Sequence, residues 1–366
     1  MAWMRGLRSL LTMFAVVSSA NALKNVATVK TLAVAGGHTY SYTIAPASYG
    51  RGTYLLLHGF PSSSYDWRHT VKDLTADGFG VIAPDLLGYG ATSKPTAVEE
   101  YAQEKISGHV TEILQHEGIA NVVGVGHDWY VTATRLSRDY LTQRRGSGLL
   151  STMWYCHPEL FKSLAFLATP YSPVGPNPIN LTAINTKTQA AFGYPVYGYW
   201  NFFNESDAAS VIEKHHESFT SLLYPHNAST WKTDVCPIGS LKAWLEADKQ
   251  SSKPGYITEQ EWKIHDRIML GGGYTGPLNW YKAAMAGLNR SPTLETARQS
   301  INKHVVFISG AADAVGRPEL AQQTADEGRK SGLLPDVETF VVPDAGHWVQ
   351  VEQSSRVLTV LKSLDS

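Results

Sequence analysis

Short apolar runs that end at Gly, Pro or Asp recur along the chain, and helix-like segments separate several of them. Runs of this kind are typical of strands in a sheet that is buried on both faces. We expect six such strands, at Tyr54–Leu57, Val81–Ala83, Val122–Val125, Leu164–Leu167, Val305–Ile308 and Phe340–Val342. Segments such as Glu104–His116 and Pro318–Ser331 have the character of helices. The alternation predicts an α/β fold with a mostly parallel central sheet and helices on both faces.

The alternation stops between about residues 170 and 290. This part of the chain has few strand signals and carries aromatic-rich, helix-like pieces such as Ser240–Gln250 and Thr258–Met269. We interpret residues 171–285 as a helical cap inserted into a core that is formed by residues 23–170 and 286–366. Catalytic loops belong at the carboxyl ends of the strands, so a cap there would cover the site and exclude water.

The composition of the chain indicates which kinds of ligand or substrate the protein can bind. The 366 residues are 43% hydrophobic, enough for a large core, and 31 basic residues nearly balance 32 acidic ones. No long-range field would therefore draw the chain to nucleic acid or to an anionic surface, and a small neutral substrate fits better. Cys156 and Cys236 are too few for a disulfide framework or a cysteine zinc site. Because no metal-ligand spacing is present either, we expect no metal and no cofactor.

The N-terminus has the pattern of a targeting segment. Arg5 and Arg8 precede the apolar stretch Leu10–Val17, and an A-x-A cleavage pattern follows at residues 20–22. We predict that residues 1–22 are a signal peptide and that the protein is secreted; a membrane-associated N-terminal helix is the alternative. The apolar stretch is too short for a stable membrane span. Three N-x-S/T triplets, compatible with a secretory pathway, begin at Asn180, Asn204 and Asn227.

A carboxylate stands where a hydrolase nucleophile would be expected. Gly126-His127-Asp128-Trp129 directly follows the expected strand Val122–Val125. A nucleophile elbow needs a strand that turns sharply, so that one side chain is exposed at the edge of the sheet. The chain has no G-x-S-x-G, so a serine esterase would lack its nucleophile at the expected place. Asp128 is therefore the candidate nucleophile; a strand-terminal Asp that caps a helix is the alternative.

Three more candidates follow other expected strands. In His58-Gly59-Phe60-Pro61, backbone N–H groups can face a developing oxyanion. Asp313 and His347 come later, each just after a strand. The order of nucleophile, acid and histidine is the one that an α/β-hydrolase requires. A buried core histidine or an aspartate that caps a loop would explain either residue alone, but four placements in one order indicate an active site.

On these motifs the chain resembles the epoxide hydrolases of the α/β-hydrolase superfamily, over nearly everything after residue 30. The family's H-G-x-P, G-H-D-W-G, late Asp and G-H-W motifs correspond to His58–Pro61, Gly126–Trp129, Asp313 and Gly346–Trp348. The resemblance implies an α/β-hydrolase fold with an inserted helical cap. It also implies a cis bond before Pro61 and a structural turn at Pro84–Gly90.

The resemblance extends to tyrosines of the expected cap. Gly276–Tyr281 resembles the motif that supplies one of the family's two ring-opening tyrosines, which gives Tyr281 that role. Tyr199 matches the second motif best, although a shift of register would favour Tyr197 or Tyr194. Phenols stay un-ionised at neutral pH and can donate a hydrogen bond and a proton to an alkoxide. Packing in a helical lid would explain any one of these tyrosines.

The implied reaction opens a small apolar epoxide with water in two steps. Asp128 attacks a ring carbon and forms an alkyl ester, while Tyr199 and Tyr281 hold the epoxide oxygen. His347, oriented by Asp313, then activates water against the ester carbonyl.

In this scheme the amides of Phe60 and Trp129 stabilise the tetrahedral intermediate.

Haloalkane and haloacid dehalogenases are the alternative function, since they also use an Asp nucleophile and a His base. They need halide-binding donors, and Phe60 has no side-chain donor where haloalkane dehalogenases commonly place Asn. A third hypothesis, of another class, is a non-catalytic product whose site is disabled by residues 130–145.

Residues 130–145 depart from the family pattern. The family's elbow ends in Gly, which lets the next helix pack close to the strand, whereas this chain has Tyr130. Gly146–Phe161 reads like the family's own continuation after G-H-D-W. Removing residues 130–145 would restore G-H-D-W-G followed by an apolar helix, so we hypothesise that they translate a retained short intron.

Deleting residues 130–145 should raise both soluble yield and epoxide turnover. Thr132–Tyr140 and Leu149–Tyr155 compete for the place behind the elbow, and the second segment is denser in apolar residues. Expression yield, melting temperature and turnover of an epoxide panel would be compared between the full chain and the deletion variant. A less stable or less active deletion variant, or transcripts without a spliced form, would show that the segment is an authentic part of the protein.

Overall fold

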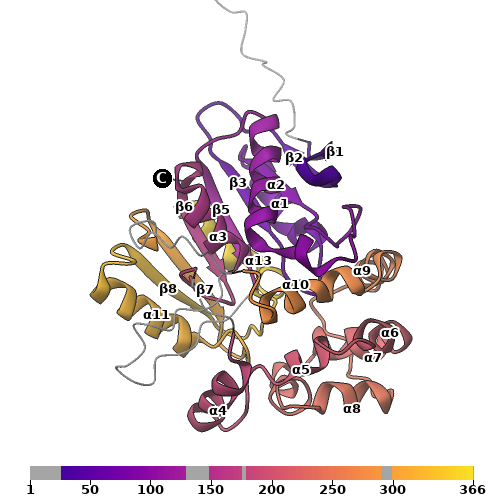
Figure 1. Cartoon of the computed structure of the whole chain (residues 1–366). Helices are drawn as coiled ribbons and strands as arrows, with labels where there is room; N and C mark the ends of the chain where they lie inside the picture. The colour runs from indigo at the N-terminus through magenta and orange to yellow at the C-terminus, as the bar shows by residue number, and fades with distance from the viewer. Residues whose placement is uncertain (1–25, 129–147, 175–178, 290–298, 366) are drawn as a thin grey trace, which may run out of the picture.

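The computed structural model describes residues 26–128, 148–174, 179–289 and 299–365. The predicted signal peptide (1–22), Trp129 and the predicted insertion (130–145) lie outside the described residues. Figure 1 shows a central sheet with helices packed along it and a further group of helices at one end.

The sheet has eight strands in the order β1-β2-β4-β3-β5-β6-β7-β8. Their bounds are Thr28–Ala33 (β1), Thr39–Ala45 (β2), Thr53–Leu57 (β3), Gly80–Pro84 (β4), Val122–His127 (β5), Phe161–Leu167 (β6), Val305–Gly310 (β7) and Val337–Val342 (β8). The β1–β2 and β2–β4 pairs are antiparallel, and the pairs from β4 to β8 are parallel. Each of the six expected runs lies within a strand, which confirms the mostly parallel sheet.

The central strands β3 to β7 are buried on both faces, which explains their continuous apolar runs, whereas β8 has exposed positions at Glu338 and Val341. Leu55 and Leu57 of β3 belong to one apolar cluster, and Tyr54 and Leu56 belong to the cluster on the opposite face. The first cluster packs against α2 (Gln103–His116), α3 (Leu149–Cys156) and α11 (Pro318–Ser331), and the second against α1 (Arg68–Ala76) and α13 (Ser354–Ser363). Successive side chains of a strand point to opposite faces, so a strand covered on both sides needs apolar residues at every position.

The two antiparallel strands at the edge, β1 and β2, were not expected from the sequence. In β1, Leu32 is half-buried and the other five residues are exposed, and the strand lies at the edge of the sheet, paired with β2. An exposed edge strand has no apolar run to reveal it.

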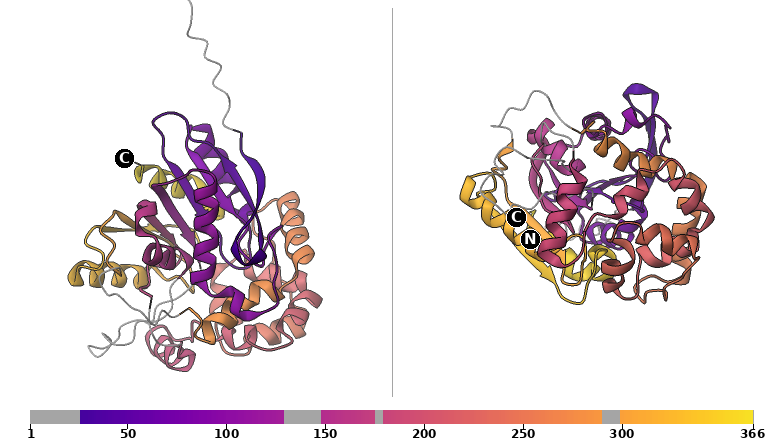
Figure 2. Two further views of the ribbon diagram at one scale, coloured as in Figure 1. Left: turned by 45° about the horizontal axis from the view of Figure 1, so that its top comes forward. Right: turned by 60° about the horizontal axis from the view of Figure 1, so that its bottom comes forward.

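The chain between β6 and β7 is helical wherever the structure describes a regular element. Its α-helices are α4 (Leu181–Phe192), α5 (Tyr199–Phe203), α6 (Ala208–Lys214), α7 (His216–Leu223), α8 (Ser240–Glu246), α9 (Glu259–Gly272) and α10 (Thr275–Met285). Figure 1 and the left view of Figure 2 place them at one end of the sheet. Thr258 starts α9 with a capping box to Glu261, which satisfies two backbone donors of the first turn. The domain limits at residues 171 and 285 stay predictions.

The helix directly behind β5 is α3. Leu150 of α3 packs so closely on β5 that a Cβ added at Gly124 would lie 2.9 Å from its Cδ1 atom. Gly148, which precedes α3, and Asp128, which follows β5, line the same small cavity. Asp128 and Gly148 therefore lie close together, and the position behind β5 is occupied by Leu149–Cys156.

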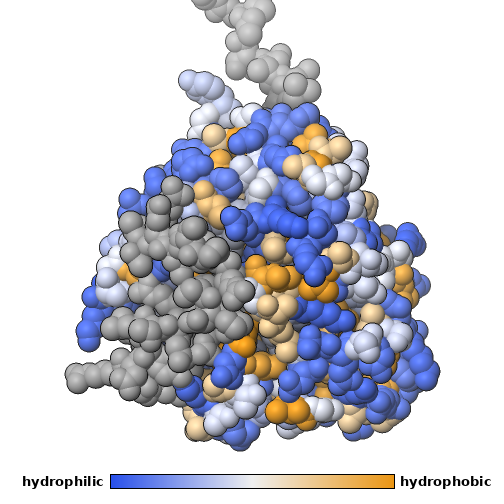
Figure 3. Space-filling view, in the orientation of Figure 1, coloured by the Kyte–Doolittle hydropathy of each residue, from blue (hydrophilic) through white to orange (hydrophobic). Residues whose placement is uncertain are grey.

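The described surface is mostly hydrophilic in the orientation of Figure 3, with apolar residues gathered around the position of α10. In the described ranges, no helix combines the length and apolar character needed to cross a membrane.

Candidate active site

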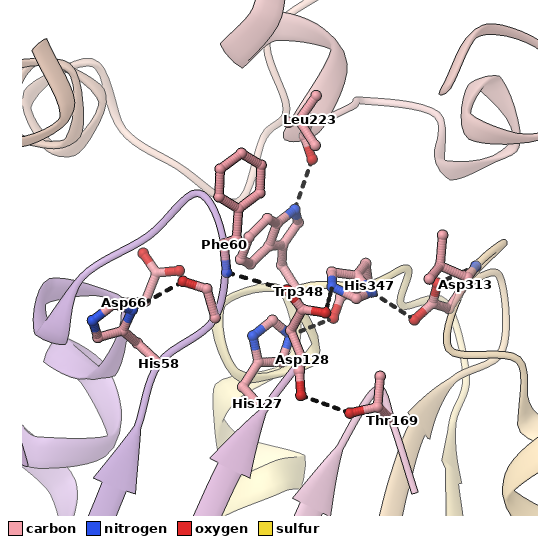
Figure 4. Close-up of polar contacts among 12 residues, drawn as sticks. His58, Phe60, Asp66, His127, Asp128, Thr169, Leu223, Asp313, His347 and Trp348 are labelled. Carbon is pink, nitrogen blue, oxygen red and sulfur yellow. Dashed lines mark hydrogen bonds and ion pairs between the residues drawn. The ribbon is translucent and has the colours of Figure 1, made fainter. Parts of the chain in front are cut away.

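Four loops at the carboxyl ends of parallel strands converge on one point (Figure 4). They carry Phe60 after β3, Asp128 after β5, Asp313 after β7 and His347 after β8. Parallel strands end at the same edge of a sheet, which explains why residues up to 287 positions apart in the sequence meet there. The structure thus brings together four of the residues that the sequence indicated.

Asp128 is held in a strained backbone conformation. Its φ of 60° is in the left-handed region, which costs on the order of 1 to 3 kcal/mol for a residue other than Gly. The strand register continues through this turn, since the Asp128 amide donates to the Leu167 carbonyl oxygen. The Thr169 hydroxyl donates to the Asp128 carbonyl oxygen at 2.7 Å. These bonds tie the turn that carries Asp128 to the end of β6 and to the residues that follow it.

The two carboxylate oxygens of Asp128 have different surroundings. The Phe60 backbone N–H donates to Oδ2 at 3.1 Å, whereas Oδ1 lies 3.8 Å from His347 Nε2. Gly59 makes this approach possible, because a Cβ on it would lie 2.5 Å from Asp128 Cβ. The Phe60–Pro61 bond is cis, as the family resemblance implied. An amide donor on one oxygen and a histidine near the other can support attack by Oδ1 and stabilise charge on Oδ2.

His58 fixes the loop that carries Phe60. Its Nε2 accepts the backbone N–H of Leu86 at 3.0 Å, so the ring proton is on Nδ1, which donates to the Gly59 carbonyl oxygen at 2.9 Å. Burial lowers the pKa of His58, which favours this neutral form. The Pro84–Gly90 turn is structural, as expected, since Asp85 accepts the backbone N–H groups of Ser64 and Ala91.

His347 and Asp313 form a buried pair. His347 Nδ1 donates to Asp313 Oδ2 at 2.9 Å, and the Asp313 side chain is completely buried. The Val315 amide donates to the other oxygen, Oδ1, at 2.8 Å. Burial by itself would lower the pKa of His347, but the charges of Asp313 and Asp128 outweigh it and raise the pKa to about 9. His347 is therefore protonated at neutral pH, beside the Asp313 and Asp128 carboxylates whose charges raise its pKa.

Two residues that the sequence did not single out hold His347 in place. His127 Nε2 donates to the His347 carbonyl oxygen at 3.0 Å, and burial followed by the charge of His347 lowers the pKa of His127 well below 6.5. Glu352 accepts the amides on either side of His347, from Gly346 at 2.7 Å and from Trp348 at 2.9 Å. His127 directly precedes Asp128, and Glu352 lies five residues after His347. Neither position predicts its role, because the role depends on hydrogen bonds that only the structure shows.

Tyr281 and Tyr199 lie on the inserted helices, Tyr281 against Phe60 and Tyr199 against Tyr281. Tyr281, on α10, is buried, and its ring centroid lies 5.1 Å from that of Phe60. Tyr199 begins α5, and its ring centroid lies 6.4 Å from that of Tyr281. Burial and then the charge of Asp128 raise the pKa of Tyr199 well above 10. Its hydroxyl therefore keeps its proton and is close enough to Asp128 to respond to its charge.

The other two candidate tyrosines have different surroundings. The Tyr194 hydroxyl donates to the Ala314 carbonyl oxygen at 2.8 Å and accepts from Arg317 Nη1 at 3.1 Å. The Tyr197 hydroxyl is buried and has no hydrogen-bond partner within the described part of the chain. The ring contact with Tyr281 favours Tyr199 as the second member of the pair.

Solvent can approach the site on the His347 side. A cavity of about 430 Å³ is lined by Trp231, Asp313 and His347 and by neighbouring loop residues. The residues that the structure describes contain no group of three or more His, Cys, Asp or Glu side chains that could hold a metal ion.

Known proteins resemble the chain along most of its length. A family model for the alpha/beta hydrolase fold matches residues 54–129. Epoxide hydrolase 3 of Siraitia grosvenorii is 29% identical over 325 residues, which are 85% of this chain and 91% of that protein. Bifunctional epoxide hydrolase 2 of Rattus norvegicus is 27% identical over 310 residues, which are 84% of this chain. The chain spans about half the length of the mammalian relatives it matches.

Solved structures agree on the fold. Epoxide hydrolase A of Mycobacterium thermoresistibile superposes with a TM-score of 0.70 at 23% identity, over 93% of this chain and 98% of that one. The fold is thus the α/β-hydrolase fold that the motifs indicated.

The pKa of His347 should fall below about 9 in Asp128→Asn, because one of the negative charges that raise it is removed. NMR titration of the labelled histidine would measure the shift, with Asp326→Asn on the exposed face of α11 as the control. An unchanged pKa in Asp128→Asn would show that Asp128 does not contribute to the protonation of His347.

Proposed function

We propose that this member of the α/β-hydrolase superfamily hydrolyses epoxides to vicinal diols through a covalent alkyl ester on Asp128. The observation that carries the proposal is the placement of Asp128 between the Phe60 amide and the His347–Asp313 pair. The similarity to epoxide hydrolases over 84 to 87% of the chain supports it. A small neutral epoxide and water are the substrates.

In the first step Asp128 Oδ1 attacks a ring carbon, and the carbon–oxygen bond of the epoxide breaks. The electron pair of that bond goes to the ring oxygen, which becomes an alkoxide and takes a proton from a tyrosine. Tyr199 and Tyr281 are the donors. Burial keeps the Tyr199 hydroxyl protonated until the alkoxide forms, so its hydrogen bond strengthens in the transition state.

In the second step water attacks the carbonyl carbon of the ester. Esterification removes the negative charge of Asp128, which lowers the pKa of His347 from about 9. His347 can then lose its proton, which restores the tyrosine hydroxyl, and act as the base that takes a proton from the attacking water. Collapse of the tetrahedral intermediate breaks the ester bond to the substrate oxygen. That oxygen takes the carboxyl proton and leaves in the diol, and the Asp128 carboxylate is restored. The Phe60 amide already points at Oδ2, where negative charge develops in the tetrahedral intermediate. Trp129, the other proposed oxyanion donor, lies outside the described residues.

We also propose that the protein is secreted and that residues 1–22 direct it. The support is the pattern of these residues and the exposure of the asparagines that begin the three N-x-S/T triplets, Asn180, Asn204 and Asn227. Surface exposure is what a glycosylated asparagine requires.

Asp128→Ala should abolish turnover, whereas His347→Gln should permit attack and trap the ester, because only the second step needs the base. Intact-protein mass spectrometry after incubation with an epoxide panel would detect the adduct. His304→Gln is the matched control. His304 also pairs with an aspartate, Asp336, but it precedes β7 and so lies at the opposite end of the parallel strands from His347, which follows β8. If His347→Gln accumulates no adduct from an epoxide that the wild type hydrolyses, the two-step scheme is wrong.

Tyr199→Phe and Tyr281→Phe should each slow ring opening on the order of a hundredfold and leave the melting temperature nearly unchanged, because each loses a donor that acts in the transition state. Single-turnover ester formation would be compared with that of Tyr194→Phe and Tyr197→Phe. A larger loss in Tyr197→Phe than in Tyr199→Phe would reassign the second donor. Unchanged epoxide opening, together with efficient halide release from haloalkanes, would favour the dehalogenase alternative.

A further inference from the structure

The chain segment after α7 contacts both loops that carry the reactive groups. The Tyr224 hydroxyl lies 2.9 Å from the carbonyl oxygen of Pro61, to which it donates. The Tyr224 ring stacks on the indole of Trp348, with centroids 4.2 Å apart and planes 15° apart. The preceding residue, Leu223, accepts a hydrogen bond from Trp348 Nε1 at 2.7 Å (Figure 4). The inserted helices thus meet the core at two points through adjacent residues.

Both contacted residues are neighbours of groups that act on Asp128. Pro61 follows Phe60, whose amide lies 3.1 Å from Asp128 Oδ2, and Trp348 follows His347, whose Nε2 lies 3.8 Å from Oδ1. We propose that Tyr224 is a positioning residue that holds the Phe60 amide and the His347 ring in register on the two sides of Asp128. The proposal rests on the proposed function, and it assigns to the inserted helices a part in the hydrolytic step.

The surroundings of Tyr224 suit this role. Its side chain is fully buried, so its hydroxyl must donate to a protein acceptor. Asp66 Oδ2 is a second acceptor at 3.5 Å, but the single proton goes to the nearer Pro61 oxygen. The ring is held on its other sides by Trp262 and His265, at centroid distances of 6.1 and 4.9 Å. A side chain fixed in this way can restrain the loop that it contacts.

A second donor converges on the same carbonyl. His265, on α9, lies with Nε2 2.9 Å from the Pro61 oxygen, and its Nδ1 is 3.6 Å from Asp266 Oδ1. A carbonyl oxygen has two lone pairs and can accept from both. Two separate parts of the inserted segment therefore hold one atom of the Phe60 loop, so loss of one donor should loosen the loop without releasing it.

Tyr224→Phe isolates the hydrogen bond, because it removes the hydroxyl and keeps the ring that stacks on Trp348. Ring opening should stay within about twofold of wild type, while ester hydrolysis should slow about tenfold, as expected when an oxyanion donor shifts by a fraction of an ångström. Rapid-quench mass spectrometry with styrene oxide would show the ester accumulating. Tyr54→Phe is the matched control: its buried hydroxyl donates to the Leu361 carbonyl oxygen at 2.9 Å, near the opposite end of β3.

A second measurement does not depend on the reaction. Amide hydrogen exchange at Phe60 should be faster in Tyr224→Phe, and also in His265→Leu, than in wild type or Tyr54→Phe. The proposal is overturned if exchange at Phe60 is unchanged in both variants, or if ring opening and ester hydrolysis slow equally in Tyr224→Phe. A wild-type protein that forms no ester with any epoxide would refute the proposed function, and the exchange data would still decide whether Tyr224 positions the loop.

Discussion

The negative charge of Asp128 is the constraint on which the rest of the site depends. A carboxylate with only 11% of its side chain exposed must be compensated, and the fold provides an amide from one loop and an imidazolium from another. The backbone of Asp128 has a φ of 60°, and position 59 must be Gly because a Cβ there would collide with Asp128. The strain and the close contact persist because strand pairing and several hydrogen bonds hold the loops around them.

The same charge couples the two steps of the proposed reaction. Asp313 and Asp128 together keep His347 protonated, so the base is not available until Asp128 has been consumed as a nucleophile. His127 and Glu352 hold the backbone of His347 rather than its ring, which leaves Nε2 directed toward Asp128. The histidine is therefore fixed in position while its protonation state follows the covalent state of its neighbour.

The inserted helices contribute more than a cover. Tyr281 and Tyr199 bring their rings to the site, and Tyr224 meets the loops that carry Phe60 and His347. In the proposed reaction the inserted segment therefore acts in both steps. Tyr281 and Tyr199 donate protons during ring opening, and Tyr224 positions groups that act in ester hydrolysis. The contacts come from α10, α5 and the residue that follows α7, so their convergence depends on how the whole segment packs rather than on one motif.

The sequence by itself determined the strands that are buried on both faces and the order of Asp128, Asp313 and His347, because periodicity and strand-end motifs are local properties. It also indicated that Leu149–Tyr155 belongs behind the elbow, where α3 lies. It missed the antiparallel strands β1 and β2, of which β1 is exposed and has no apolar run.

Only the tertiary structure decided which atoms meet. Tyr199 is favoured over Tyr194 because its ring lies against Tyr281, while the Tyr194 hydroxyl is already bonded to Ala314. The roles of Glu352 and Tyr224 depend on hydrogen bonds whose partners are set by how the loops and inserted helices pack. Local sequence cannot predict these hydrogen bonds, because the partners of a side chain across the fold are determined by packing rather than by its neighbours in the chain.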